Sequence, residues 1–307
     1  MSRNVLLVPH TGRDEALSAT LEAIEGLIAA GLTVAMDAKQ LTEAKLATGS
    51  NSYAVSQFEK VRTLGDSCAL ADIEVAMVFG GDGTILRAAE LVRAEGTPLL
   101  GVNLGHVGFL AESERPELSE AVSRIVKQDY VIRERLTLDV VVLSEGREVY
   151  RTWALNEATV EKSRSGKMLE VVVEIDSRPL TSFGCDGIVM ATPTGSTAYA
   201  FSAGGPVIWP SVEALMLIPL SAHALFSKPL VVNPDSLLAV EVLQRSSGHG
   251  TLWADGRRTF ELPPGARVEV RRSSQPVRLA RLRTGSFTDR LVNKFGLPVT
   301  GWRGPEA

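Results

Sequence analysis

The spacing of apolar residues changes near residue 130 of this 307-residue chain. Before that point, short apolar runs such as Val5–Val8 alternate with longer amphipathic stretches such as Glu15–Ala30. Strands that alternate with helices are typical of a parallel sheet with helices on both faces. After that point, apolar and polar residues alternate with a period of two, as in Leu136–Leu143, and turn residues separate the runs. This second pattern is typical of antiparallel sheets, so the chain is expected to form two domains of different class.

The predicted fold class is α/β plus all-β. We expect a Rossmann-like parallel α/β domain over residues 1–130 and an antiparallel, β-sandwich-like domain over 131–285. The last segment, 286–307, has a helical pattern over Phe287–Phe295, and we expect it to pack back on the first domain. In the first domain we expect a polar connection after residue 36, followed by a helix near 53–65. In the second domain the pattern predicts one continuous strand over 149–161.

Composition excludes several classes of protein. The hydrophobic and charged fractions, 45% and 22%, are those of a soluble globular protein, and a net charge of −4 gives no reason to expect nucleic acid as a partner. Two cysteines without a Cys-x-x-Cys motif and four scattered histidines exclude a zinc cluster or a disulfide framework. No apolar run is long enough for a membrane span, and the N-terminal apolar run is too short for a signal peptide. A cytoplasmic location and no membrane partner are therefore expected.

A loop of three glycines and one acid, Gly80–Thr84, follows the apolar run Val75–Phe79 and precedes a helical stretch over Ile85–Arg93. The loop therefore lies at the carboxyl end of a predicted parallel strand. Ligand phosphates commonly bind there, because glycine lets the backbone come close and the N–H groups of a helix terminus attract anions. The loop is neither the dinucleotide fingerprint nor a Walker loop. The carboxylate of Asp82 indicates a deprotonation or a bound metal; the alternative is a tight turn in which Asp82 caps the helix.

Two further clusters accompany this loop. Asn103–Phe109 has two glycines three apart behind a predicted strand, and its His106 is expected to be a structural, hydrogen-bonded group. Asn156 and Glu157 interrupt an apolar strand, where an amide and a carboxylate are unfavourable without partners. Hydroxyls or a base edge of a ligand would supply those partners; a buried pair bonded to loop backbone is the alternative.

The densest polar cluster is Thr192–Tyr199, which carries five hydroxyl side chains and no lysine. Such a run offers neutral donors and acceptors and one aromatic face, which suits a nucleoside with its ribose hydroxyls. By contrast, Trp253–Arg257 is interpreted as an ordinary Asp-Gly hairpin turn.

In their order along the chain, these motifs resemble those of bacterial NAD kinases, most closely the actinobacterial members. The resemblance rests on Gly80–Thr84, Asn103–Phe109, Asn156-Glu157, Asp186-Gly187, Thr192–Tyr199, Gly204-Gly205-Pro206, Asp255-Gly256 and the ending Phe287-Thr-Asp-Arg-Leu-Val. The glycine loop alone is shared with diacylglycerol kinases, sphingosine kinases and phosphofructokinases, so the combination is the specific feature. Gly184 departs from the pattern, because some members carry an arginine there. Lys167 lies about where another family arginine falls and is a candidate substitute.

The resemblance implies a two-domain fold with NAD bound between the domains. It implies transfer of a phosphoryl group from ATP, or from inorganic polyphosphate, to the 2′-hydroxyl of the adenosine ribose of NAD. It further implies a divalent cation, usually Mg²⁺, and a homo-oligomer, either a dimer or a tetramer. Asp82 would be the catalytic base and would also contact NAD. The other residues implied to bind NAD or phosphate are Gly83, Arg87, Asn156, Glu157, Lys167, Asp186, Thr197, Ala198, Tyr199, Ala200, Phe201 and Ser202.

Two alternatives from other classes remain. A lipid or sugar kinase could share the glycine loop, but it would lack the Asn156-Glu157 pair and the Thr194–Tyr199 run. A non-catalytic NAD-binding regulator could keep the nucleoside pocket, but it would have no need for an acid in the phosphate loop.

Overall fold

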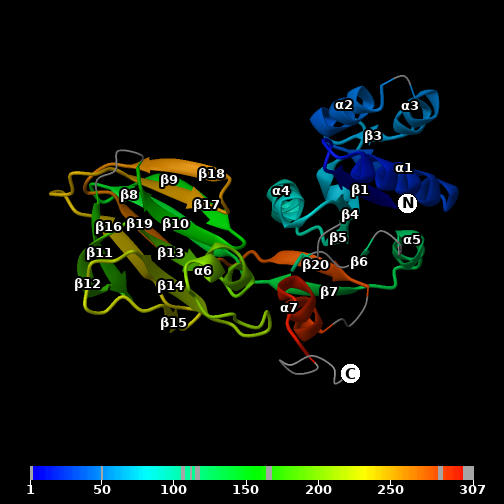
Figure 1. Cartoon of the computed structure of the whole chain (residues 1–307). Coiled ribbons are helices and arrows are strands. Elements are labelled where there is room, and N and C mark those ends of the chain that lie inside the picture. Colours follow the sequence, from blue (N-terminus) through cyan, green and yellow to red (C-terminus); the bar gives the residue numbers. More distant parts are fainter. Residues whose placement is uncertain are drawn as a thin grey trace. The chain divides into compact units, whose positions relative to one another are not determined.

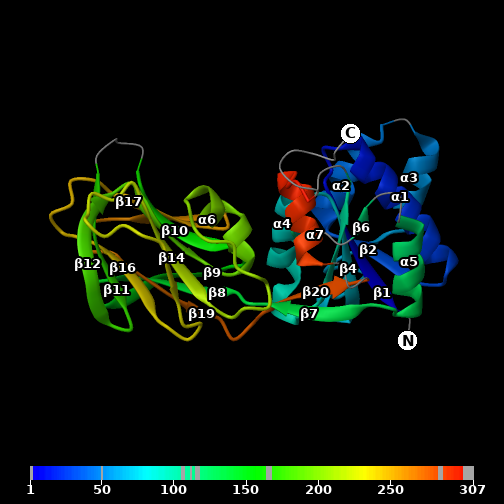
Figure 2. The ribbon, with the colours of Figure 1, turned by 60° about the horizontal axis from the view of Figure 1, so that its bottom comes forward.

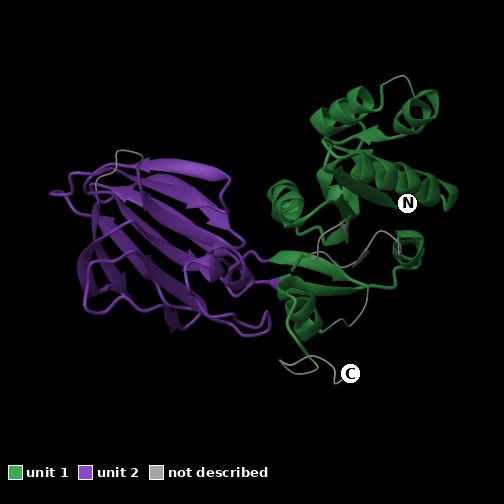
Figure 3. Cartoon of the chain, viewed as in Figure 1, with its two compact units in different colours: residues 1–134, 277–307 green, residues 135–276 purple. Residues whose placement is uncertain are grey.

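The computed structural model of the chain describes residues 3–49, 51–104, 108–110, 113–114, 118–163, 168–282 and 286–299. The chain divides into two compact units, residues 1–134 with 277–307 and residues 135–276 (Figure 3). As predicted, the first unit contains a largely parallel α/β sheet and the second contains antiparallel sheets. Two residues singled out from the sequence, His106 and Lys167, lie outside the described residues.

Unit 1 is built on one sheet in the order β3-β2-β1-β4-β5-β20-β7, with β6 paired to β5 (Figure 1). Its strands are β1 (Asn4–Pro9), β2 (Thr33–Met36), β3 (Arg62–Thr63), β4 (Ile73–Phe79), β5 (Leu99–Asn103), β6 (Ser113–Glu114), β7 (Val131–Arg135) and β20 (Val277–Arg281). The chain runs from β1 through β2 to β3 on one side and then continues with β4 and β5 on the other. The strand order therefore reverses between β1 and β4. In open α/β sheets, ligands bind outside the carboxyl ends of the strands at such a reversal.

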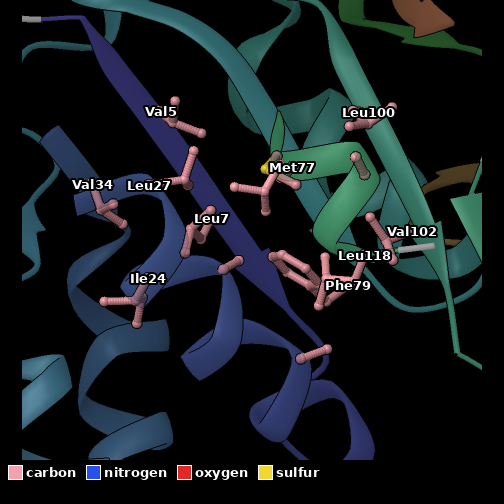
Figure 4. Close-up of a cluster of buried hydrophobic side chains, with 14 of the residues drawn as sticks. Val5, Leu7, Ile24, Leu27, Val34, Met77, Phe79, Leu100, Val102 and Leu118 are labelled. Carbon is pink, nitrogen blue, oxygen red and sulfur yellow. The ribbon is translucent and has the colours of Figure 1, made fainter. Parts of the chain in front are cut away.

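Helices cover both faces of this sheet. The helices of unit 1 are α1 (Asp14–Ala29), α2 (Ala38–Ala47), α3 (Ser52–Phe58), α4 (Asp82–Val92), α5 (Leu118–Lys127) and α7 (Phe287–Phe295). Figure 4 shows the core on one face, where alternate residues of β1 and β4 such as Leu7 and Met77 pack against Ile24 and Leu27 of α1. Helix α4 contacts β1, β4 and β5 but contributes no side chain to that cluster, so it covers the opposite face. None of the helices in the described ranges is both long and apolar enough to cross a bilayer.

The connection after residue 36 differs from the prediction. Where the sequence indicates a polar connection, the structure has helix α2, whose N-terminus is capped by Asp37. The Asp37 carboxylate accepts hydrogen bonds from the N–H groups of Lys39 (3.0 Å) and Gln40 (3.2 Å). Only three residues of α2 are buried, so its apolar pattern is weak, and the cap is the signal that identifies it. The helix predicted near 53–65 is shorter and ends at Phe58.

Residues 277–281, placed by the sequence pattern in the second domain, form strand β20 of the first sheet. Leu279 of β20 pairs in parallel with Leu99 of β5, and β7 runs beside β20 (Figures 1 and 2). Helix α7 contacts Phe109, in the earlier part of unit 1. The ring centroids of Phe287 and Phe295 each lie 5.9 Å from that of Phe109.

Unit 2 is a sandwich of two antiparallel sheets. The first has the order β15-β14-β13-β10-β17-β18, and the second has the order β12-β11-β16-β19-β8-β9. Their strands are β8 (Leu138–Ser144), β9 (Arg147–Ala154), β10 (Glu157–Lys162), β11 (Leu169–Ile175), β12 (Arg178–Cys185), β13 (Gly187–Ala191), β14 (Leu215–Leu220), β15 (Leu230–Val232), β16 (Leu238–Val242), β17 (Gly250–Ala254), β18 (Arg258–Leu262) and β19 (Arg267–Arg272). One apolar cluster contains inward side chains of both sheets, such as Val160 of β10 and Val171 of β11.

The predicted strand over 149–161 is two strands. The chain leaves β9 at Ala154 and enters β10 at Glu157, and these strands belong to different sheets of the sandwich. Leu155 and Asn156 therefore form the crossing between the two sheets. Their N–H groups are not in a sheet ladder and need other partners. The break gives Asn156 and Glu157 a different setting from the continuous strand that the sequence predicts.

Candidate functional site

The three glycines of the loop after β4 have different structural roles. Gly80 has φ +155°, and a Cβ there would collide with the side chain of Thr84, so the fold itself requires glycine. Gly81 has φ −82°, which any residue adopts, and a Cβ at Gly81 or Gly83 would meet no described atom within 4 Å. No described contact explains glycine at these two positions. What they leave is an open approach to the backbone N–H groups at the first turn of α4, which is how a phosphate is bound.

Asp82 lies between these two open glycines, half-buried, as the first residue of α4. Its Oδ2 accepts a hydrogen bond from the N–H of Phe109 (3.1 Å), and its Oδ1 accepts one from the N–H of Leu110 (3.1 Å). A Cβ on Gly108 would come within 2.6 Å of Oδ1, so glycine is needed there for the approach. The structure thus joins the two glycine loops through Asp82. Because Gly81 is the N-cap without a side-chain cap bond, Asp82 does not cap its helix.

Arg87 lies one turn further along α4 and reaches the end of the neighbouring strand. Its Nη2 donates a hydrogen bond to the carbonyl oxygen of Pro9 (2.6 Å), the last residue of β1. The next residue, His10, donates its backbone N–H to the carbonyl oxygen of Phe79 (2.9 Å), directly before the glycine loop. The guanidinium of Arg87 is therefore fixed at the point where the strand order reverses, beside the loop after β1.

In unit 2, the carboxylate of Asp255 holds the crossing between the sheets. It accepts hydrogen bonds from the N–H groups of Leu155 (2.9 Å) and Asn156 (2.7 Å), and from Nη2 of Arg258 (2.8 Å). Asp255 and Gly256 both have positive φ in the turn between β17 and β18, so the predicted hairpin turn is present. The sequence alone gives no signal for this second role, because the groups that Asp255 binds lie about 100 residues away.

Glu157 is buried at the start of β10, and its Oε2 has no hydrogen-bond partner among the described residues. Burial raises the pKa of Glu157 to about 8, and the negative charge of Asp255 adds to this rise. A hydrogen bond from the backbone of Tyr199 acts in the opposite direction. A buried polar atom without a partner is unfavourable unless something else supplies one. A ligand donor at Oε2 would do so, and a shifted carboxyl of this kind is a common feature of functional sites.

The polar run after β13 is hydrogen-bonded to the crossing at Leu155 and Asn156. Thr192 donates its backbone N–H to the carbonyl oxygen of Asn156 (2.9 Å) and its hydroxyl to that of Leu155 (2.6 Å). A Cβ at Gly195 would collide with the Asn156 backbone, so glycine permits the close packing. The structure therefore brings together the Asn156-Glu157 pair and the polar run, which the sequence indicates only as separate clusters.

The hydroxyl groups of the run do not all point outward. Thr192 and Ser196 are fully buried and bind backbone groups, with Ser196 donating its hydroxyl to the Pro193 carbonyl oxygen (2.7 Å). These two side chains serve the fold of the loop. Thr197 is half-buried, and Tyr199 begins the short helix α6 (Tyr199–Ser202) with 39% of its surface exposed.

The other predicted residues in and next to α6 differ in their exposure. Phe201 and Ser202 are exposed and Ala198 is half-buried. Ala200 is fully buried in an apolar cluster with Met216 and others. The side chain of Ala200 therefore packs against the β-sheet.

Asp186 lies apart from Glu157. Along β10, Glu157 pairs with Ala191 and Glu161 pairs with Gly187, so four residues separate the two ends. At about 3.3 Å per residue this is roughly 13 Å. The Asp186 carboxylate is 2.6 Å from Nζ of Lys162, which lowers its pKa.

At Gly184, where some members of the family have an arginine, the side chain of Met168 lies against the backbone. A side chain at Gly184 would collide with Met168, so the space that an arginine would need is taken there. The proposed substitute, Lys167, stays a prediction because it lies outside the described residues.

The described part of the chain contains no group of three or more His, Cys, Asp or Glu side chains placed to hold a metal ion. Mg²⁺ does not need such a group. It usually keeps several waters and binds through one or two carboxylates together with substrate phosphates. One carboxylate, Asp82, beside two glycines that leave the backbone open, fits this kind of binding.

Comparisons with known proteins agree with these features. The model of the ATP-NAD kinase N-terminal domain matches residues 5–130, and that of the ATP-NAD kinase C-terminal domain matches residues 155–282. The chain is 58% identical to an NAD kinase of Leifsonia xyli over 304 residues, which cover 99% of this chain and 98% of that protein. It is 57% identical to NAD kinase 2 of Streptomyces coelicolor over 302 residues, which cover 98% of this chain and 97% of that protein.

Solved structures share the fold. The yeast NADH kinase complexed with NADH has a TM-score of 0.84 at 21% identity, covering 99% of this chain and 90% of that one. An NAD kinase from Archaeoglobus fulgidus in complex with ATP has a TM-score of 0.65 at 23% identity, covering 96% and 98%. At these identities the likeness concerns the fold alone. Because both domain models match, and relatives along nearly the whole length share more than half of its residues, the chain belongs to the NAD kinase family.

Proposed function

We propose that the chain transfers a phosphoryl group from ATP, or from inorganic polyphosphate, to the 2′-hydroxyl of the adenosine ribose of NAD⁺, giving NADP⁺. The observation that carries this proposal is the setting of Asp82. Its carboxylate is held by two backbone N–H groups between two glycines that the described contacts do not require. A phosphate bound at those glycines and a base fixed beside it are what such a transfer needs.

Asp82 takes the proton of the attacking hydroxyl. Each carboxylate oxygen accepts one backbone hydrogen bond and keeps a second lone pair for that proton. The two hydrogen bonds fix the orientation of the carboxylate, so little further ordering is needed when the substrate binds. Gly81 and Gly83 admit phosphate oxygens to the N–H groups of α4, and Arg87 adds positive charge on the same helix.

Asn156 and Glu157 bind the adenosine part of NAD in this proposal. Oε2 of Glu157 accepts a hydrogen bond from a ribose hydroxyl or from an amino group of the base, which satisfies the buried atom. Tyr199 borders the base with its exposed ring, together with Thr197, Ala198 and the exposed residues Phe201 and Ser202. Asp186 contacts a more distant polar group of the dinucleotide.

A divalent cation, Mg²⁺ in the first instance, completes the proposal. Asp82 would hold it together with the phosphates of the donor, and the ion would neutralise charge on the phosphoryl group during transfer. The homo-oligomer and the cytoplasmic location expected from the sequence also stay predictions.

The test is product formation by the purified protein with NAD⁺, Mg²⁺ and either ATP or polyphosphate. A dehydrogenase strictly dependent on NADP⁺ then converts the product to NADPH, which is followed by its absorbance. Asp82→Asn should lower kcat by about 10²–10⁴-fold, the usual contribution of a general base, while NAD affinity is largely kept. A fall smaller than about tenfold would refute the role of Asp82.

The melting temperature of Asp82→Asn serves as the control for its fold. The amide of asparagine turns an NH₂ group toward one of the two backbone donors, which costs roughly 1–3 kcal/mol in the folded state. Calorimetric NAD affinity separates that loss from a loss of chemistry. If NAD⁺ binds tightly to the unchanged protein and neither donor yields NADP⁺, the proposed reaction is wrong.

A further inference from the structure

Unit 1 contains a cavity of about 330 Å³ beside the glycine loop, and its lining is not used by the function proposed above, Arg87 excepted. The lining residues are Asp37, Lys39, Gln40, Glu43, Arg87, Glu90 and Leu91. They come from the segment directly after β2 and from α2 and α4, so the cavity lies at the carboxyl edge of the sheet. Its volume is at the lower end of the range for small-molecule sites, which suits one nucleoside better than a whole dinucleotide.

Gln40 lines this cavity and carries a buried acceptor. The residue is 7% exposed, and its Oε1 has no hydrogen-bond partner among the described residues. A buried amide oxygen without a partner is unfavourable, so the site is incomplete until a donor group occupies it. The required ligand therefore carries an N–H or O–H group.

The charges of the lining disfavour a polyphosphate chain inside the cavity. Three carboxylates, those of Asp37, Glu43 and Glu90, face two cationic groups, those of Lys39 and Arg87. Glu43 is also oriented toward the loop after β1 by the hydroxyl of Thr11, which donates to its Oε2 (2.8 Å). Carboxylates accept hydrogen bonds from hydroxyl and amino groups but repel anions. A ribose and a base carry the groups that this lining accepts.

The cavity and the glycine loop lie on one face of α4. Gly83, Arg87 and Glu90 stand at positions i, i+4 and i+7 of this helix, which share a face. At 1.5 Å per residue, Gly83 and Glu90 are about 10 Å apart along the axis. A ligand with a nucleoside in the cavity can therefore extend its phosphates along Arg87 toward the open backbone at Gly83.

We propose that this cavity binds the nucleoside part of the phosphoryl donor, with Gln40 as a specificity-determining residue for ATP. The inference rests on the proposed function, because it assumes that the donor phosphates bind at the glycine loop. It also distinguishes the two donors: ATP carries a nucleoside and polyphosphate carries none. Changes in the cavity should therefore affect the use of ATP and leave the use of polyphosphate unchanged.

The test compares Gln40→Leu and Leu91→Trp with the unchanged protein. Gln40→Leu removes the acceptor, and Leu91→Trp fills the cavity without touching the acceptor. Gln57→Leu is the matched control, because Gln57 is a buried amide of the same unit whose Oε1 is bonded to Lys60 Nζ (3.0 Å) and does not line the cavity. KM is measured for ATP, for NAD⁺ and for polyphosphate. If polyphosphate gives no product, inhibition of the ATP reaction by inorganic tripolyphosphate takes its place.

Both cavity variants should raise the KM for ATP about tenfold or more. Gln40→Leu does so by the loss of one hydrogen bond to a buried group, and Leu91→Trp does so because its ring occupies the space of the nucleoside. The KM for NAD⁺ and the KM for polyphosphate (or the inhibition constant for tripolyphosphate) should stay within about twofold of the control. If both donors weaken together, or if NAD⁺ weakens instead, the nucleoside assignment is wrong. If the KM for ATP does not change while NADP⁺ is formed, the cavity is not a donor site and the proposed function stands. If the unchanged protein forms no NADP⁺, the proposed function itself fails.

Discussion

Replacing Glu157 by glutamine should make unit 2 more stable, and the gain should grow with pH. In the folded chain the carboxyl of Glu157 has a pKa raised to about 8, because it is buried and lies near Asp255. At neutral pH it is therefore mostly protonated, with one donor and one acceptor. Glutamine has almost the same shape and the same donor and acceptor character, but it never ionises. The fold should accept it without rearrangement.

The magnitude follows from the two pKa values. The folded value of about 8 is about 3.5 above the ordinary value of 4.5, which the unfolded chain adopts. Each pKa unit of difference corresponds to about 1.36 kcal/mol, so the full effect on the free energy of unfolding is roughly 5 kcal/mol. Because the pKa of this acid is higher in the folded than in the unfolded chain, its ionisation lowers the stability of the fold as the pH rises. Below pH 4.5 both states hold the proton and there is no effect. Between 4.5 and 8 the unfolded chain alone releases the proton, so stability falls, and above 8 the loss is complete.

The assay is urea unfolding followed by tryptophan fluorescence at pH 5, 6.5 and 8. Trp153, Trp209 and Trp253 lie within residues 135–276, so the signal reports mainly on unit 2. The free energy of unfolding of Glu157→Gln minus that of the unchanged protein should rise by about 4 kcal/mol from pH 5 to pH 8.

Glu174→Gln is the matched control for this assay. Glu174 is hydrogen-bonded to Arg267, which lowers its pKa, so its variant should be less stable by the same amount across this whole pH range. If the curves of Glu157→Gln and the unchanged protein are parallel, Glu157 is ionised in the fold and the reasoning is refuted.

Two further predictions concern single residues that the structure explains. Gly83→Ala should keep or slightly raise the melting temperature, because its Cβ meets no described atom and alanine favours the helix by up to about 1 kcal/mol. NADP⁺ formation by this variant should nevertheless fall at least about tenfold, and unchanged activity would show that no ligand approaches there. Gly80→Ala should instead destabilise the fold. Asp255→Ala should lower the stability of unit 2 by about 3–5 kcal/mol and weaken NAD binding, because the N–H groups of Leu155 and Asn156 lose their buried acceptor. Melting curves and calorimetry measure these two effects, and a loss of stability below about 1 kcal/mol would contradict the role given to Asp255.

Local patterns were sufficient to predict the parts of the fold that depend on neighbouring residues. The glycine loop between an apolar run and an amphipathic helix predicts its own place at the carboxyl end of β4. The strand β11 and the helix α7 are found over the predicted residues, Leu169–Ile175 and Phe287–Phe295. In each case the spacing of apolar residues within the segment, or the turn residues beside it, identifies the element, so no distant partner is needed to recognise it.

Features that depend on distant partners could not be predicted. The crossing at Leu155 and Asn156 has an apolar residue followed by a polar one, as the neighbouring strands also do. It is recognised only because β9 and β10 pair with strands of different sheets. Asp255 binds the N–H groups of this crossing from about 100 residues away. Strand β20 looks like one more strand of the second domain, and only its pairing with β5 places it in the first sheet. Pairing of this kind is set by tertiary contacts, which a sequence pattern does not contain.

The glycines of the two loops and of the polar run separate what the fold needs from what a ligand needs. Gly80 has a positive φ, and Gly108 and Gly195 each lie where a Cβ would press on another part of the chain. The fold accounts for these three. Gly81 and Gly83 have neither constraint in the described structure, and at position 83, within helix α4, glycine lowers stability relative to alanine. A glycine that lowers stability without a structural reason indicates a functional role, and the role we propose at this turn is contact with phosphate.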